Sequence, residues 1–159
     1  MGFLTGKTAI ITGGGRAVLS NGECGSIGYG IATAYAKEGA NLVLTGRNVQ
    51  KLTDAKEELE KKYGIKVLPV QADVSAGADN EAIVQNVVKQ AIDTFGRIDV
   101  LINNAQASAS GVTIADHTTE QFYLAVYSGL YAAFYYMKAC YPYLKETKGS
   151  VINFASGAC

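Results

Sequence analysis

Glycine residues gather in one stretch of this 159-residue chain, and they are placed where a loop could hold a phosphate group. The apolar, β-branched run Thr8–Thr12 predicts a buried strand before them, and a helix is expected to begin at about Ile27. A loop without side chains lets the backbone close on a phosphate, while the amides and dipole of the next helix favour its negative charge. The alternative is a flexible surface connection, because a strict G-x-G-x-x-G is absent. The glycines are Gly13, Gly14, Gly15, Gly22, Gly25, Gly28 and Gly30.

Further candidate ligand-binding residues follow three other predicted strands. Asp73 and Val74 come after the run 66–72, Asn103 comes after 98–102, and Ser156 comes after 151–155. The carboxyl ends of parallel strands share one edge of a sheet, and ligands of open α/β sheets bind at that edge. The sequence therefore predicts that these residues and the glycine loop meet in one site.

The elements that would position this site alternate along the chain. Strands are expected at 8–12, 41–45, 66–72, 98–102 and 151–155. Helices are expected from about Ile27 and at 48–63, 79–95 and 118–145. Asn48 and Gly64 are suited to cap the second helix, Thr118 and Gln121 form a capping box for the last, and Pro69 places its strand at a sheet edge. The order predicts an α/β fold in one domain, residues 1–159, with a Rossmann-like, doubly wound parallel sheet.

Composition excludes several classes of partner. The chain has 14 basic and 14 acidic residues, so we expect no nucleic-acid or membrane-surface binding, and no apolar run is long enough for a membrane span. The three cysteines and one histidine have no metal-ligand spacing, so no metal site is expected. Widely spaced thiols favour a cytoplasmic location.

These motifs together resemble the short-chain dehydrogenase/reductase family over the whole chain. Thr12 and Gly13 resemble the start of its T-G-x-x-x-G-x-G loop, which resumes at 26–28 after an insertion. The run 26–32 is also similar to the S-I-x-Y-G-I-A turn of divergent enoyl-carrier-protein reductases. The stretch 103–105 resembles N-N-A-G, with Gln106 in place of the glycine, and Asp73-Val74 resembles the pair that contacts adenine. The cofactor-binding residues that the resemblance implies are Gly13, Gly14, Arg16, Ser26, Ile27, Gly28, Arg47, Asp73, Val74, Asn103 and Ala105.

The choice of cofactor depends on charge beside the adenosine ribose. Gly46 stands at the end of the second strand, where a carboxylate would bind the ribose hydroxyls and repel a 2′-phosphate. Arg16 and Arg47 are expected nearby, and guanidinium groups bind phosphate through charge-assisted hydrogen bonds. We therefore expect NADP rather than NAD. The alternative for Arg47 is a solvated residue at the start of a helix.

The resemblance implies that Ser156 is the catalytic serine, which orients the substrate oxygen. The Tyr-x-x-x-Lys that the family uses as general acid/base lies downstream of that serine, so the chain is expected to be truncated after the fifth strand. The string from Tyr141 to Lys145 precedes the serine and is expected at the opposite side of the sheet. Gly129 takes the place of the family's helix asparagine.

These observations predict an NADP-dependent oxidoreductase that moves a hydride between nicotinamide and a secondary alcohol or ketone, of hydroxysteroid or 3-oxoacyl type. One alternative is a truncated, non-catalytic dinucleotide-binding module, and a weaker one is an oligomerisation or regulatory fragment without nucleotide. The helix 118–145 carries aromatic residues on all sides, which predicts a homo-oligomer through this helix.

Overall fold

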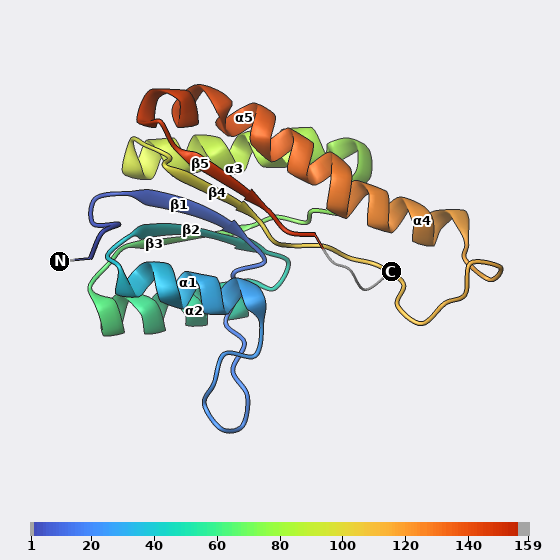
Figure 1. The fold of residues 1–159 in the computed structure, drawn as a ribbon, viewed down its shortest axis with the longest axis horizontal. Coiled ribbons are helices and arrows are strands. Elements are labelled where there is room, and N and C mark those ends of the chain that lie inside the picture. The colour runs from blue at the N-terminus through green and yellow to red at the C-terminus, as the bar shows by residue number, and fades with distance from the viewer. Residues whose placement is uncertain (1, 156–159) are drawn as a thin grey trace.

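The computed structural model describes residues 2–155, which fold around a single five-stranded parallel sheet (Figure 1). The strand order is β3-β2-β1-β4-β5, so the chain moves outward from β1 on one side and then crosses to the other. This topology confirms the predicted Rossmann-like fold. The strands are β1 (Thr8–Thr12), β2 (Asn41–Gly46), β3 (Val67–Gln71), β4 (Val100–Asn103) and β5 (Ser150–Asn153).

Helices cover both faces of the sheet (Figure 1). Helices α1 (Ile27–Lys37) and α2 (Val49–Tyr63) pack on one face, and α3 (Asn80–Phe95) and α5 (Ala132–Thr147) pack on the other. A 3-10 turn, η1 (Gly77–Asp79), precedes α3. A one-turn π-helix, η2 (Tyr127–Tyr131), joins α4 (Thr119–Val126) to α5.

The predicted caps form as the sequence indicates. The Asn48 side chain accepts a hydrogen bond from Lys51 N at 2.9 Å, and Gly64 ends α2 with φ of 69°. Thr118 and Gln121 form the reciprocal capping box of α4. The sequence identified these caps because each is decided within one helical turn.

Several boundaries differ from the prediction, most of them by one or two residues. Strand β4 begins at Val100, two residues later than predicted, and just before it the buried Asp99 carboxylate accepts hydrogen bonds from Thr8 N (2.9 Å) and Arg97 Nε (2.8 Å). Strand β5 begins at Ser150 and ends at Asn153, two residues before the predicted end. The predicted long helix 118–145 is interrupted by η2 and extends to Thr147.

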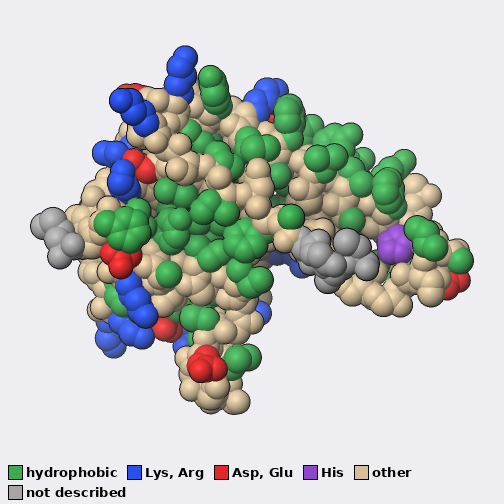
Figure 2. Space-filling model, in the orientation of Figure 1, with side chains coloured by type: hydrophobic (Ala, Val, Ile, Leu, Met, Phe, Trp, Pro, Cys, Tyr) green, Lys and Arg blue, Asp and Glu red, His purple; other side chains and the backbone are tan. Residues whose placement is uncertain are grey.

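Apolar side chains remain exposed over β5 and along α4, η2 and α5 (Figure 2). The edge strand β5 is exposed along its whole length, whereas β1 is buried throughout. No helix among residues 2–155 is long and apolar enough to cross a membrane. The exposed large side chains of these regions are Phe122, Tyr123, Leu130, Tyr131, Phe134, Tyr141, Val151, Ile152 and Phe154.

Candidate dinucleotide-binding site

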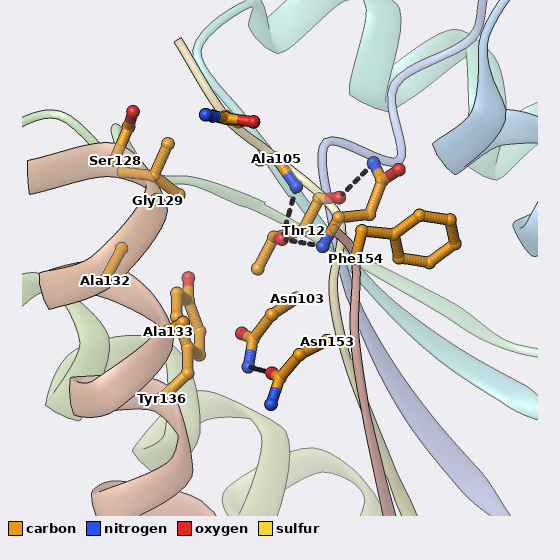
Figure 3. A pocket seen from close by; sticks show the side chains of 13 residues that line it. Thr12, Asn103, Ala105, Ser128, Gly129, Ala132, Ala133, Tyr136, Asn153 and Phe154 are labelled. Atoms are coloured by element: carbon orange, nitrogen blue, oxygen red, sulfur yellow. Dashed lines mark hydrogen bonds between the residues drawn. The ribbon is translucent and has the colours of Figure 1, made fainter. Parts of the chain in front are cut away.

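Three adjoining hollows follow the carboxyl ends of the strands. The central hollow lies between the ends of β1, β4 and β5 and the start of α5 (Figure 3), and its lining includes Thr12, Val74, Asn103, Ala105, Gly129 and Tyr136. The β2–β3 hollow, of about 290 Å³, is lined by Gly13, Thr45, Gly46, Arg47, Ala72, Asp73, Val74 and residues 104–107. The loop hollow is lined by Gly13, Gly15, Ala17, Ser26, Gly46, Arg47, Asn48, Lys51 and Leu52. Because neighbouring hollows share lining residues, they form one continuous site.

Hydrogen bonds join the carboxyl ends of β1 and β4 at the base of the central hollow (Figure 3). Thr12 Oγ1 accepts hydrogen bonds from Asn104 N (3.0 Å) and Ala105 N (2.9 Å), and Asn104 Nδ2 donates to Thr12 O (2.8 Å). Asn104 therefore ties the two central strands together. Asn103 Nδ2 donates to Asn153 Oδ1 at 2.8 Å, which joins β4 to β5 beside the hollow.

The helix wall of this hollow contains a residue that the sequence analysis missed. Ser128 Oγ, in η2, accepts a hydrogen bond from Ala107 N (2.9 Å) and lies within donor distance of Leu124 O (2.7 Å) and Ala107 O (2.9 Å). The next residue, Gly129, lines the hollow without a side chain, and a Cβ there would lie 3.5 Å from Gln106 Nε2. A serine inside a helical pattern gives no sequence signal for such a contact, because its partner lies in a distant loop.

Tyr136 lies deep in the same wall, opposite the polar groups of β4 and β5 (Figure 3). Its side chain is buried, and its hydroxyl makes no hydrogen bond to the described part of the chain. Burial raises the pKa of Tyr136 to about 12, an effect that the neighbouring Thr45 hydroxyl opposes only in part. The phenol is therefore protonated near neutral pH.

The carboxylate of Asp73 is fixed at the edge of the β2–β3 hollow. Its Oδ1 accepts hydrogen bonds from Ser75 N (2.9 Å) and Ser75 Oγ (2.7 Å). Burial works against its ionisation, but these bonds and the charge of Arg47 hold the pKa of Asp73 below its usual value. The carboxylate is therefore ionised at neutral pH and can accept a donor from a ligand in this hollow.

The glycine loop packs closely against the start of α1. Gly13 has a φ of 73°, and its amide donates to Thr45 O at 2.8 Å. A Cβ on Gly28 would lie 2.2 Å from Gly13 O, and one on Gly14 would lie 2.8 Å from Leu44 Cδ2. Ser26 caps α1 by accepting a hydrogen bond from Tyr29 N and lines the loop hollow, while the Ile27 side chain is exposed.

The inserted residues of the loop form a short hairpin that projects from the body of the molecule (Figure 1). Leu19 N donates to Glu23 O (2.8 Å), and Gly25 N donates to Ala17 O (2.7 Å). The hairpin directs Arg16 toward α2, where its Nε lies 2.5 Å from Glu58 Oε2. Arg16 therefore lines none of the three hollows, whereas Arg47 lines two of them.

Two sequence predictions concern residues away from these hollows. Ser156 lies outside the described residues, so its proposed role stays a prediction. The string from Tyr141 to Lys145 lies near the end of α5, and Thr147 just beyond it donates to Ile98 O (2.8 Å) before the amino end of β4. This string therefore lies at the edge of the sheet opposite the hollows. No group of three or more His, Cys, Asp or Glu side chains able to hold a metal occurs within residues 2–155.

A profile described as short chain dehydrogenase matches residues 7–159. The chain belongs to this family. It is 66% identical over 158 residues to a 12alpha-hydroxysteroid dehydrogenase of a Clostridium species, covering 99% of this chain and 58% of that protein. It is 35% identical to the uncharacterized oxidoreductase YhxC of Bacillus subtilis, over 96% of this chain and 49% of that protein. The chain thus spans about half to three fifths of the length of these relatives.

Solved structures of the family share the fold. L-sorbose reductase from Gluconobacter frateurii, complexed with NADPH and L-sorbose, superposes with a TM-score of 0.83 at 32% identity, over 99% of this chain and 54% of that one. An NAD+-bound xylitol dehydrogenase superposes with a TM-score of 0.83 at 26% identity, over 98% of this chain and 55% of that one. Short-chain dehydrogenases of this fold thus include structures with either nicotinamide dinucleotide.

Proposed function

We propose that this short-chain dehydrogenase chain forms the dinucleotide-binding part of an NADP-dependent oxidoreductase that acts on a secondary alcohol or ketone of the hydroxysteroid type. The 66% identity to a 12alpha-hydroxysteroid dehydrogenase carries this proposal. The bound nicotinamide would supply or accept the hydride that is exchanged with the carbinol or carbonyl carbon.

The described residues fit such a dinucleotide in two respects. The glycine loop closes so tightly on α1 that a Cβ at Gly28 would overlap the backbone, and Gly13 and Gly15 of the loop line the same hollow as Ser26, the N-cap of α1. The β2–β3 hollow offers the Asp73 carboxylate and the apolar Val74, which suit an adenine amino group and ring. The proposed cofactor-binding residues are Gly13, Gly14, Ser26, Ile27, Gly28, Arg47, Asp73, Val74, Asn103 and Ala105.

The proposed roles at the reacting end belong to the central hollow. Asn103 would border the cofactor ribose, and Ser156 would donate a hydrogen bond to the substrate oxygen and orient it. The buried Tyr136 lies in the wall of the hollow, and its protonated phenol cannot act as a base near neutral pH. NADP is proposed over NAD because Arg47 borders two hollows and no carboxylate lines the loop hollow.

The second candidate function is a dinucleotide-binding module without catalysis. The position of the Tyr141–Lys145 string favours it, since no Tyr-x-x-x-Lys reaches the hollows from residues 2–155. Titration of this chain with NADPH and NADH, followed by nicotinamide fluorescence, tests the binding that both candidates require. Reduction of NADP by a 12α-hydroxysteroid then separates them. Saturable binding with turnover supports the oxidoreductase, binding without turnover supports the module, and a folded chain that binds neither dinucleotide contradicts both.

We also propose a homo-oligomer through residues 118–145 and a cytoplasmic location. Aromatic rings along α4, η2 and α5 form a continuous series with centroid separations of 5.4–6.2 Å, and several of them are exposed. Contiguous aromatic surface of this kind is typical of protein interfaces. The wide spacing of the three cysteines suits a reducing compartment.

A further inference from the structure

Asn80 is a buried polar residue at the start of α3, and it lines none of the three hollows. Its side chain reaches back from the helix, so that Nδ2 donates to Val74 O at 2.7 Å and to Tyr127 O at 3.4 Å. Val74 lines both the central hollow and the β2–β3 hollow, and Tyr127 is the first residue of η2. One side-chain amide thus joins the loop after β3 to the helix wall of the central hollow.

The orientation of this amide is fixed by its surroundings. Both groups that it faces are carbonyl oxygens, which only accept hydrogen bonds, so the nitrogen of the amide must point toward them. Asn80 Oδ1 is buried and makes no hydrogen bond to the described part of the chain. An unpaired buried oxygen lowers the free energy of unfolding, and the N-cap residue of α3 is Asp79 rather than Asn80. The stability of the helix therefore does not explain an asparagine at this position.

The segments that Asn80 joins form parts of two hollows. The loop after β3 packs on the Tyr127 ring, since a Cβ on Gly77 would lie 3.8 Å from Tyr127 Cε2. Helix η2 is also bonded to the loop after β4, where Ala107 N donates to Ser128 Oγ at 2.9 Å. Both loops line the β2–β3 hollow, through Val74 and Ala107, while Ser128 lines the central hollow. A shift of η2 relative to these loops would therefore change both hollows together.

We propose that Asn80 is a positioning residue that holds the loop after β3 and the η2 wall in one arrangement, so that binding at the adenosine end of the site also places the wall at the nicotinamide end. The inference rests on the proposed function in that it takes the adenosine end of a dinucleotide to occupy the β2–β3 hollow. Asn80 acts through the carbonyl groups of Val74 and Tyr127 and contacts no ligand itself. Without its amide the loop and η2 adopt further arrangements, and the apparent affinity falls with the fraction of molecules that can bind.

The test uses Asn80→Ser and Asn80→Asp in the 159-residue chain. Both residues suit the first turn of a helix, but serine is too short to reach the two carbonyl groups and an ionised carboxylate cannot donate to them. Each variant should bind ADP, and whichever of NADPH and NADH the wild type binds more tightly, about two- to tenfold more weakly, the factor that one lost hydrogen bond gives. At saturating dinucleotide the nicotinamide emission should also differ from that of the wild type, because the wall beside the nicotinamide has moved.

Asn86→Ser is the matched control, because Asn86 is an exposed asparagine of the same helix. It should leave the affinities and the nicotinamide emission unchanged. Calorimetric titration measures ADP binding, nicotinamide fluorescence measures dinucleotide binding, and thermal unfolding shows that each variant is folded before affinities are compared.

Three outcomes would overturn the inference. Asn80 variants that are less stable but keep wild-type affinities and emission would show a purely structural role. Weaker ADP binding with an unchanged nicotinamide emission would show that Asn80 serves the adenosine end alone. Both of these outcomes leave the proposed function intact, whereas a folded wild-type chain that binds neither dinucleotide nor ADP overturns the proposed function as well.

Discussion

Ser128 connects the interrupted helix to the loop after β4 through one buried hydroxyl. That hydroxyl accepts a hydrogen bond from Ala107 N and contacts the carbonyl oxygens of Leu124 and Ala107. In Ser128→Ala the partly buried Ala107 amide loses its partner, and the loss of one hydrogen bond lowers the free energy of unfolding by about 0.5–1.5 kcal/mol. Urea denaturation measures this loss. Ser108→Ala, at an exposed position in the same loop, is the control, and equal effects of both substitutions would show that the Ser128 contact does not matter.

Whether the contact of a residue could be predicted depended on how far along the sequence its partner lies. The caps at Asn48, Gly64 and Thr118 were predictable because each depends on neighbours within one helical turn. The contacts of Arg16 with Glu58 and of Ser128 with Ala107 join residues 42 and 21 positions apart. Their existence depends on how the hairpin and η2 pack, which no local pattern encodes. The role of both arginines in binding a 2′-phosphate stays a prediction; Arg47 lines two of the hollows, whereas Arg16 is paired with Glu58.

At the scale of elements, the glycine loop can pack against α1 only because residue 28 is a glycine and has no side chain. A Cβ at Gly28 would lie 2.2 Å from Gly13 O, so Gly28→Ala must push α1 away from the loop. We expect a loss of about 1–3 kcal/mol in unfolding free energy, together with weaker dinucleotide binding.

Gly30 offers a matched control in the same helix. A Cβ there meets nothing nearer than Cys24 Cβ at 3.8 Å. Gly30→Ala should leave stability unchanged or raise it by up to about 1 kcal/mol, because alanine favours a helix interior. Urea denaturation and NADPH titration of both variants check these outcomes, and a Gly28→Ala protein as stable as the wild type would contradict the packing argument.

Element order was readable from the sequence because hydrophobic periodicity and caps agreed along the whole chain. The edge position of β3 was also predictable, since Pro69 lacks an amide donor for a second neighbour. The break in the helix 118–145 was not predictable. Its aromatic and apolar residues continue an ordinary helical pattern through η2, and within η2 Ser128 makes a hydrogen bond to Ala107 in a distant loop.

At the scale of the whole molecule, two apolar surfaces are left on the described residues: the edge strand β5 and the aromatic side of α4, η2 and α5 (Figure 2). Burial of such surface is the main source of association free energy. If the aromatic surface is the interface, a charge placed within it must be desolvated on association and should weaken the oligomer.

Phe134→Asp tests this directly, because Phe134 is 53% exposed and its ring lies 5.5 Å from that of Tyr135. Light scattering during size-exclusion chromatography should show a wild-type oligomer and a variant of lower mass at equal concentration. Phe3→Asp introduces the same charge at a phenylalanine that is 77% exposed and lies outside α4–α5, and it should leave the mass unchanged. A mass reduced by Phe3→Asp but not by Phe134→Asp would place the contact elsewhere. A loss of oligomer only on substitution of Val151 or Ile152 would assign the interface to β5, where a partner strand can pair with the free edge.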